Sequence, residues 1–384
     1  SANVLGYSCA RVCPVEVLCV GKCVYNQWGR APIQIGKLQR FAVETAWNEG
    51  ARGLFPKPLP ATGKKVALVG AGPASVAAAA QLALAGHKAV VYEKGALPGG
   101  LNTLGIAPYK MQASDALDEI EWVADLELVE FRCGVEVVER VSGDGQVAAS
   151  SLLEEYDAVF LAIGIGGDAM LGASAGAGPA ERVVGATEWI EELRKKPLHD
   201  TKVGPKVIVV GAGNTAIDAA TEAARLGAEE VTIVYRRGKE EMPAYEFEYE
   251  LALKDKVRFQ WFTQPVEVLG NGKVEGLKCH RMAPGEDDES GRPVPVPVPN
   301  SEFVIEADTV IKATGQVKHD FLSGIDGVEL QWGLVKVDEN YRTTNPKYYA
   351  GGDCVNGGKE VVNAVYHAKQ AALAMHRVLS EGGK

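Results

Sequence analysis

The sequence predicts an α/β protein made of two doubly wound parallel-sheet units, one inserted into the other, behind a small helical segment. Three observations lead to this prediction. An apolar strand followed by a glycine-rich turn and a helix occurs twice, beginning near Val66 and near Val207. Each copy closes with an apolar run that ends in glycine, at Gly164 and at Gly315. Four of the seven cysteines lie within fifteen residues, Cys9–Cys23, ahead of both copies.

Length and charge narrow the class of protein. A chain of 384 residues with 46% hydrophobic content is long enough for two or three domains. A net charge of −10 argues against nucleic acid or an anionic membrane as the main partner. No apolar run is long enough to cross a bilayer, and no signal peptide is evident, so we expect a cytoplasmic protein. The chain starts at Ser1, close to the cysteines and without Met, so we expect upstream sequence to be missing.

The N-terminal segment carries its cysteines in the pattern Cys9-x3-Cys13-Pro-x4-Cys19-x3-Cys23. Thiolates this closely spaced can bind one iron–sulfur cluster. Zinc is the competing metal, although structural zinc sites more often use cysteine pairs that are well separated in sequence. A helix is expected over Ile35–Asn48, followed by a proline-rich linker at residues 55–60.

The first glycine loop has the features of a dinucleotide-binding, Rossmann-like turn. Gly70 allows a tight turn and Gly72 lets the backbone approach a pyrophosphate, which then lies at the N-terminus of a helix. Glu93 follows 23 residues after Gly70, a suitable place to hydrogen-bond a ribose diol. Ser75 replaces the third glycine and should perturb helix packing only slightly. The alternative is an ordinary glycine turn in an α/β domain.

The second glycine loop, at Gly211 and Gly213, has different residues after its next strand. No carboxylate ends the strand Val231–Tyr235, and Arg236 and Arg237 follow it instead. Guanidinium groups suit a ribose 2′-phosphate, so the sequence favours NADPH over NADH. The alternative is that one arginine stacks on the adenine or is simply solvated.

The rest of the chain completes the two units. Strands are expected at 157–164, 206–210, 257–262, 266–269, 274–282 and 308–315, and helices at 214–226 and 360–379. The acidic run 286–289 and the alternating prolines 293–299 are expected to form an exposed, stiff loop. Cys133, Cys279 and Cys354 stand singly, without the CxxC pair that a dithiol–disulfide reductase needs beside its flavin.

With these motifs the chain resembles a known electron-input module that contains FAD and oxidises NAD(P)H. The module occurs in the small subunit of bacterial glutamate synthase, in the N-terminal part of dihydropyrimidine dehydrogenase, and in the large subunit of NADH-dependent ferredoxin:NADP oxidoreductase. The resemblance extends over essentially the whole chain. It rests on the cysteine run, the two glycine loops and five short motifs: Pro32-Ile-Gln-Ile-Gly-Lys-Leu-Gln39-Arg-Phe, Pro98-Gly-Gly-Leu101, Val234-Tyr-Arg-Arg237, Glu241-Met-Pro-Ala244 and Ala350-Gly-Gly-Asp353.

The resemblance implies roles for single residues. Cys13, Cys19, Cys23 and Gln39 match cluster ligands, whereas Cys9 matches a family cysteine that need not ligate. Relatives usually hold two 4Fe–4S clusters, with the other cysteines upstream, so Cys9 is the candidate fourth ligand if only one cluster is present. Asp353 matches the carboxylate that binds the flavin ribityl chain, and Val361 and Val362 match the helix start near the flavin ring. The full set of expected cofactor-binding residues is Gly70, Gly72, Pro73, Ala74, Glu93, Lys94, Gly100, Leu101, Val137, Ala162, Gly164, Gly352, Asp353, Val361, Val362, Gly211, Gly213, Asn214, Thr215, Arg236, Arg237 and Gly315.

We therefore expect an iron–sulfur segment at residues 1–54, an FAD-binding domain at 64–168 and 317–384, and an NAD(P)H-binding domain at 169–316. The expected function is electron transfer between NAD(P)H and iron–sulfur clusters through FAD, in the service of a larger catalytic subunit or a ferredoxin-like carrier. No acid–base residue is required for hydride transfer, so none is assigned. Two alternatives remain: a non-catalytic zinc-binding interaction subunit, and a self-contained FAD dehydrogenase.

Overall fold

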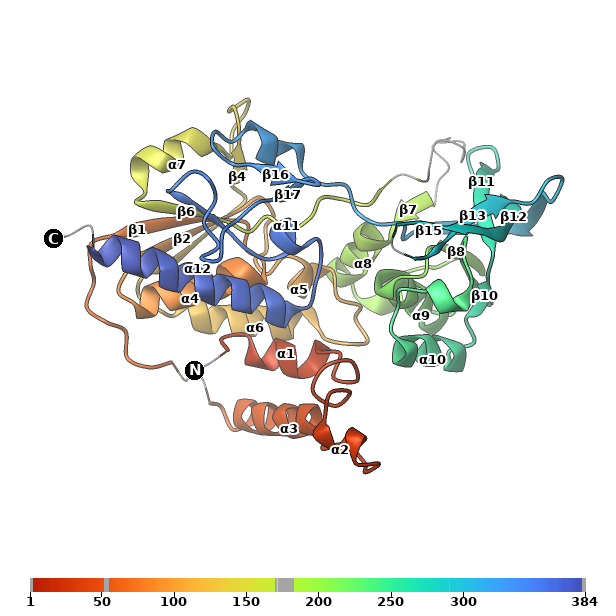
Figure 1. The fold of residues 1–384 in the computed structure, drawn as a ribbon, viewed down its shortest axis with the longest axis horizontal. Coiled ribbons are helices and arrows are strands. Elements are labelled where there is room, and N and C mark those ends of the chain that lie inside the picture. The colour runs from red at the N-terminus through yellow and green to blue at the C-terminus, as the bar shows by residue number, and fades with distance from the viewer. Residues whose placement is uncertain (1–2, 52–54, 170, 172–182, 290, 382–384) are drawn as a thin grey trace. The chain divides into compact units, whose positions relative to one another are not determined.

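The computed structural model describes residues 3–51, 55–169, 171, 183–289 and 291–381 (Figure 1). The chain divides into two compact units. The first unit comprises residues 1–106, 110–166 and 318–384, and the second comprises 107–109 and 167–317. Each unit is described by itself.

The first unit is built on a parallel five-stranded sheet in the order β18-β6-β1-β2-β3. Alternate residues of its strands belong to two different cores: Leu68 and Phe160 face one, and Val69 and Leu161 face the other. Both faces of this sheet are therefore buried, as expected for parallel strands. The strands are β1 (Lys65–Val69), β2 (Lys88–Glu93), β3 (Val129–Cys133), β6 (Ala158–Leu161) and β18 (Tyr348–Ala350).

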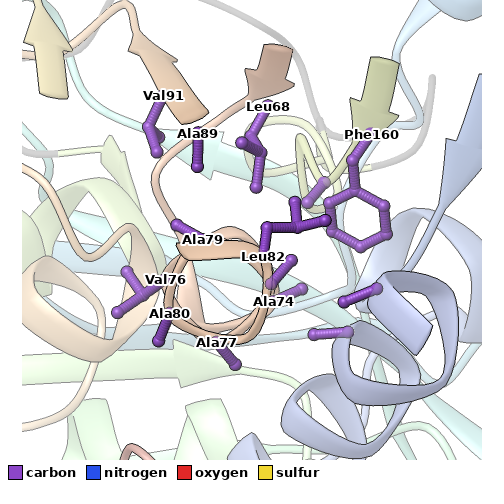
Figure 2. Packing of buried hydrophobic residues seen from close by; sticks show 14 of the residues in the cluster. Leu68, Ala74, Val76, Ala77, Ala79, Ala80, Leu82, Ala89, Val91 and Phe160 are labelled. Carbon is purple, nitrogen blue, oxygen red and sulfur yellow. The ribbon is translucent and has the colours of Figure 1, made fainter. Parts of the chain in front are cut away.

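Helix α4 (Pro73–Leu84) lies between this sheet and helix α12 (Val361–Glu381). Figure 2 shows its small side chains, such as Ala77 and Ala80, on the helix surface, with Leu82 beside Phe160 of the sheet. Nine of its twelve residues are buried, so the helix is apolar all round, as its sequence predicts. Short side chains let the helix approach the strands closely, and this places its N-terminus at the end of β1.

The smaller elements of the first unit surround this framework. They are α5 (Leu101–Leu104), α6 (Ala113–Ala124), β4 (Glu136–Val138), β5 (Gln146–Ala148), α7 (Ala149–Glu155), η3 (Asp320–Gly324), β16 (Leu330–Gln331), β17 (Leu334–Val335) and α11 (Asp353–Asn356).

The cysteine-bearing segment forms α1 (Gly6–Val12), α2 (Val24–Gln27) and α3 (Ile35–Asn48), which confirms the helix expected at 35–48. Trp47 stacks on Tyr7 with ring centroids 4.0 Å apart and contacts Trp122 of α6 at 4.3 Å. The aromatic stack attaches the segment to α6.

The second unit repeats the design with a parallel sheet in the order β10-β9-β8-β15-β7. Its strands are β7 (Val183–Gly185), β8 (Lys206–Val210), β9 (Glu230–Val234), β10 (Arg258–Gln260) and β15 (Thr309–Lys312). Its helices are α8 (Ala186–Lys195), α9 (Asn214–Arg225) and α10 (Glu246–Lys254), with short 3₁₀ turns η1 (Leu198–Asp200) and η2 (Lys239–Glu241). The expected helix at 214–226 and the expected strands at 206–210, 231–235, 257–262 and 308–315 are confirmed to within a few residues, whereas β7 was not expected.

Between β10 and β15 the chain forms an antiparallel sheet, and one prediction made for this region was wrong. It contains β11 (Thr263–Leu269), β12 (Gly276–Asp287), β13 (Pro293–Pro297) and β14 (Phe303–Glu306). Residues 286–289 and 293–299 were expected to form an exposed loop, but residues 286 and 287 end β12, and residues 293–297 pair with β12 as an edge strand. In a strand, the backbone N–H groups of alternate residues point to the same edge. The prolines at every second position therefore lack N–H groups only along the unpaired edge, and the pairing with β12 along the other edge is not interrupted.

Candidate functional site

The first glycine loop makes a turn that only glycine fits. Gly70 has φ of +88°, and a Cβ there would lie 2.6 Å from the carbonyl oxygen of Ala162. Its N–H donates to the carbonyl of Tyr92 at 2.8 Å. The loop therefore passes tightly between the ends of β6 and β2 and delivers Gly72 to the N-terminus of α4, where Pro73 is the first helical residue.

Two other glycine segments meet the same helix N-terminus. The N–H of Gly99 donates to the carbonyl of Ala71 at 2.8 Å. A Cβ on Gly100 would lie 3.1 Å from Cα of Gly72, and a Cβ on Gly352 would lie 3.1 Å from Cβ of Ala74. Backbone from three parts of the chain thus forms a cradle without side chains, which fits a pyrophosphate group.

Glu93 and Asp353 supply the carboxylates of this cradle. Oε2 of Glu93 accepts the N–H of Ala71 at 2.8 Å, and Oε1 accepts the N–H of Gly95 at 2.8 Å. Asp353 is the first residue of α11, and its Oδ1 accepts the N–H of Lys359 at 3.2 Å. Burial raises the pKa of Asp353 above its usual value. Each carboxylate is thus held in place by backbone donors and retains lone pairs for a ligand.

His367 is a residue of this region that sequence reasoning missed. The N–H of Gly352 donates to its Nδ1 at 3.3 Å, and its ring lies 4.6 Å from that of Tyr341. Burial lowers the pKa of His367, which keeps Nδ1 available as an acceptor. The histidine thereby holds the glycine turn before Asp353, and nothing in the local sequence signals this contact.

The other expected flavin-site residues are placed as follows. Gly164 has φ of +69° and follows β6. The side chain of Val137 is buried in the second core of the sheet, so only its backbone is open to a ligand. Exposed side chains belong to Lys94, Leu101 and Val362, whereas Ala162 is buried and Val361 packs on the first core.

The second glycine loop repeats the geometry of the first. Gly211 has φ of +125°, and a Cβ there would lie 2.2 Å from the carbonyl oxygen of Ala313. Its N–H donates to Val234 at 3.0 Å, as that of Gly70 donates to Tyr92. Tyr92 therefore corresponds to Val234, and Glu93 corresponds to Tyr235. The second loop has a tyrosine where the first has a carboxylate.

A cavity of about 590 Å³ opens over this second loop. Its lining includes six of the expected residues: Gly211, Gly213, Thr215, Arg236, Arg237 and Gly315. Asn214 is not among them, because its Oδ1 accepts the N–H of Tyr245 at 3.0 Å and so holds the following loop. Sequence reasoning missed several polar lining residues, among them Asp168, Thr187, Gln264 and Gln316, which come from segments without a motif.

The two arginines of the cavity differ in their surroundings. Arg237 is buried, its Nε donates to the carbonyl of Pro293 at 3.1 Å, and its Nη2 lies 3.7 Å from Asp288. Arg236 is exposed, and no donor–acceptor contact holds its side chain within the described residues. Arg236 is therefore the guanidinium that is open to a ligand, while Arg237 also anchors the β12–β13 hairpin.

The cysteine loop is compact. The N–H groups of Val20 and Gly21 both donate to the carbonyl of Val15, at 2.9 and 3.3 Å. The N–H of Ile33 donates to Sγ of Cys23 at 3.4 Å. Cys13, Cys19 and Cys23 all belong to the loop that connects the end of α1 to the start of α2.

Cys9 is set apart from the other three. It lies inside α1, and burial raises the pKa of its thiol to about 12. Gln39 is exposed on α3, one turn after Gly36, where a Cβ would lie 2.3 Å from the Val15 side chain. The start of α3 is thereby held against the cysteine loop.

The thiols do not converge as ligands of a single ion would. Among the residues that the structure describes, no three His, Cys, Asp or Glu side chains are close enough to share one metal ion. Zinc would need thiolates at about 2.3 Å, and hence sulfurs about 4 Å apart. Cys13, Cys19 and Cys23 are thiol donors of the kind that a four-iron cluster takes.

Two Rossmann-like units with intact glycine loops, joined to a cysteine loop, define an oxidoreductase with two dinucleotide sites. The chain belongs to the pyridine nucleotide-disulphide oxidoreductase family, whose model matches residues 64–368. Residues 1–51 match dihydropyrimidine dehydrogenase domain II, 4Fe-4S cluster. The predicted fold class and the predicted cofactors, FAD, a nicotinamide nucleotide and a 4Fe–4S cluster, are confirmed at the level of the family.

Relatives of known name agree with this assignment. The small chain of NADPH glutamate synthase from Halomonas elongata is 37% identical over an alignment of 386 positions that covers 96% of this chain and 79% of that protein. The beta subunit of NADPH-Fe(3+) oxidoreductase from Geobacter sulfurreducens is 35% identical, over 97% of this chain and 58% of that protein. The resemblance to the electron-input module is thereby confirmed.

Solved structures share the fold. FprA from Mycobacterium tuberculosis in complex with NADPH has a TM-score of 0.65 at 20% identity, over 85% of this chain and 86% of that one. Thioredoxin reductase from T. acidophilum has a TM-score of 0.63 at 22% identity, over 84% of this chain and 100% of that one. Among the described helices, none has the length and apolarity that a membrane crossing requires.

Proposed function

We propose that this chain is the electron-transfer subunit of a larger oxidoreductase and moves electrons between NADPH and a 4Fe–4S cluster through FAD. The observation that carries the proposal is the duplicated glycine turn at Gly70 and Gly211. The strand that follows the first turn ends in the carboxylate of Glu93, and the strand that follows the second turn leads to the exposed guanidinium of Arg236. Two different dinucleotides are thereby recognised in one chain. When bound, FAD would convert the electron pair of a hydride into single electrons, and the cluster would carry those single electrons.

The first unit is the proposed flavin site. Gly70, Gly72, Gly100 and Gly352 leave room for the pyrophosphate, and Glu93 accepts hydrogen bonds from the adenosine ribose. Asp353, already oriented by the N–H of Lys359, accepts from the ribityl hydroxyls. The further contacts come from Pro73, Ala74, Lys94, Leu101, Ala162, Gly164, Val361 and Val362, and from the backbone of Val137.

The cavity of the second unit is the proposed nicotinamide nucleotide site. Gly211, Gly213 and Thr215 meet the pyrophosphate at the N-terminus of α9, and Arg236 pairs with the 2′-phosphate. Arg237 lines the same cavity, and its hydrogen bond to the carbonyl of Pro293 fixes the position of its side chain. The names of the curated relatives, two of which specify NADPH, support this choice of nucleotide.

Cys13, Cys19, Cys23 and Gln39 are the proposed cluster ligands. Cys9 is assigned to the packing of α1 rather than to the cluster, because it lies within that helix, before the loop that carries the other three cysteines. In domain terms, residues 1–54 carry the cluster, 64–168 with 317–384 bind FAD, and 169–316 bind NADPH.

The proposed partner is a larger catalytic subunit, since relatives are named small chain or subunit beta. A cytoplasmic location suits the seven free thiols, which an oxidising compartment would pair. Cell fractionation followed by immunodetection tests the location.

Anaerobic purification followed by cofactor analysis tests the function. We expect one FAD, iron with acid-labile sulfide, and bleaching of the flavin spectrum by NADPH under argon. Zinc without sulfide would favour an interaction subunit instead. Turnover of a small organic substrate without any added electron acceptor or partner would favour a self-contained FAD dehydrogenase.

A further inference from the structure

Asp168 is the single carboxylate among the described residues that line the cavity of the second unit. Its Oδ2 accepts three hydrogen bonds at the start of α8: the N–H of Thr187 at 2.9 Å, the hydroxyl of Thr187 at 2.6 Å and the N–H of Glu188 at 3.2 Å. Within the described part of the chain no donor is bonded to Oδ1. One oxygen therefore fixes the side chain, and the other is left for a ligand.

The backbone around Asp168 is built to hold the carboxylate there. A Cβ on Gly185 would lie 2.2 Å from Oδ2, so the glycine at the end of β7 leaves the space that the carboxylate occupies. The N–H of Ala169 donates to the carbonyl of Gly315 at 2.9 Å, and the N–H of Val317 donates to that of Gly167 at 2.8 Å. Backbone hydrogen bonds thus join the segment that contains Asp168 to the segment that follows β15.

Topology tells which end of the nucleotide meets Asp168. The glycine loop follows β8, which lies between β9 and β15 in the sheet. The residues after β9 face the adenosine ribose of a dinucleotide, and here they are Arg236 and Arg237. The chain end of β15, where Asp168 and Gln316 form a bridge, lies on the opposite side of the loop and so takes the nicotinamide half.

We propose that Asp168 binds the nicotinamide half of the nucleotide and favours the oxidised, cationic ring over the reduced, neutral one. This inference rests on the proposed function of the cavity as the NADPH site. A carboxylate accepts hydrogen bonds from the carboxamide or the ribose of either form, but it attracts only the pyridinium through its charge. The residue thereby biases the site toward hydride donation, and it is a specificity residue rather than an acid–base catalyst.

The test uses the oxidised, FAD-loaded protein and measures dissociation constants by calorimetry for three probes. NADP⁺ has the cationic ring, 1,4,5,6-tetrahydro-NADP has a neutral ring that donates no hydride, and 2′,5′-ADP has no nicotinamide at all. Asp168→Asn keeps an oxygen that can accept the α8 donors but removes the charge. We expect it to weaken NADP⁺ binding by about three- to tenfold, to weaken tetrahydro-NADP less, and to leave 2′,5′-ADP unchanged.

Gly185→Ala is the second variant, because it displaces the carboxylate without removing its charge. It should weaken NADP⁺ binding in the same selective way. Asp308→Asn is the matched control: Asp308 is also half-buried in the second unit and accepts a backbone N–H, that of Lys206 at 2.8 Å, but it does not line the cavity. It should leave all three constants unchanged.

Equal weakening of all three probes by Asp168→Asn, or no weakening of any, would overturn the assignment of Asp168 and leave the NADPH site standing. A parent protein that binds neither NADP⁺ nor 2′,5′-ADP would instead overturn the proposed function, and this inference with it. Raised salt should reduce the difference between NADP⁺ and tetrahydro-NADP in the parent, because the contact is between charges.

Discussion

The hydroxyl of Ser8 donates a 2.6 Å hydrogen bond to Oε2 of Glu119, a residue 111 positions away in the sequence. The same carboxylate accepts the backbone N–H groups of Tyr7 and Ser8 at 2.7 and 3.2 Å. A buried side chain of α6 thus caps the helix that leads into the cysteine loop. Glu119 is the principal polar link between the cluster segment and the flavin framework.

This link predicts a specific pH dependence of stability. Burial raises the pKa of Glu119 from 4.5 to about 7, against the lowering effect of its hydrogen bonds. Because the folded pKa is the higher one, the stabilisation is complete below pH 4.5 and is lost as pH rises through about 7. Its full size is about 3 kcal/mol. Urea unfolding followed by tryptophan fluorescence, to which Trp47 and Trp122 contribute among the six tryptophans, should show this loss between pH 5 and pH 8.

Glu119→Gln should remove that pH dependence while keeping the volume of the side chain. Glu121→Gln, an exposed change on the same helix, is the control and should behave as the parent. An unchanged pH profile in the Glu119 variant would show that another group is responsible.

Arg236→Ala should lower kcat/KM for NADPH by about ten- to a hundredfold and change that for NADH little, measured with an artificial acceptor. The reason is that a guanidinium–phosphate pair contributes about 1.5–3 kcal/mol, and NADH has no 2′-phosphate. Arg258→Ala, an exposed change on β10 away from the cavity, should affect neither nucleotide. If the parent prefers NADH and the Arg236 variant matches it, the guanidinium is not reading a phosphate.

Gly70→Ala and Gly211→Ala should separate the two dinucleotide sites. At each position an added Cβ would contact a backbone carbonyl oxygen, at 2.6 Å and 2.2 Å respectively, from a positive φ. The first variant should lose FAD and keep 2′,5′-ADP binding, and the second should do the reverse. Released flavin and calorimetry measure the two losses.

Gly134→Ala controls for backbone strain alone, because Gly134 has φ of +75° but open space around its Cβ position. It should cost about 1–2 kcal/mol of stability and retain both ligands. Loss of both ligands in either loop variant would indicate general unfolding rather than a blocked site.

Cys13→Ser and Cys19→Ser should each remove iron and acid-labile sulfide while leaving FAD bound. Cys9→Ser should retain the cluster, because Cys9 lies within α1, outside the loop that carries the other three cysteines. Iron and sulfide analysis with low-temperature electron paramagnetic resonance on dithionite-reduced protein measures the outcome. A cluster that is lost in the Cys9 variant with α-helix content intact would make Cys9 the fourth ligand.

Much of the site was predictable because its signals are local. The turns at Gly70 and Gly211 follow from glycine spacing and from the change between strand and helix periodicity, and the structure places both against neighbouring carbonyls. Residues 293–297 show the limit of such reasoning: alternating prolines indicate a loop until a partner strand is known, and only β12 makes them an edge strand.

The sequence by itself determined the strand, glycine turn and helix that begin each unit, and the cysteine run, since each depends on residues within a few positions of one another. Only the tertiary structure decided which groups are open to ligands. It buries Arg237 against Pro293 and leaves Arg236 exposed, although the two are adjacent in sequence. It also brings Asp168 to the cavity and Ser8 to Glu119. Such contacts join segments with no shared periodicity, because burial and hydrogen bonding between distant residues are properties of the packed chain.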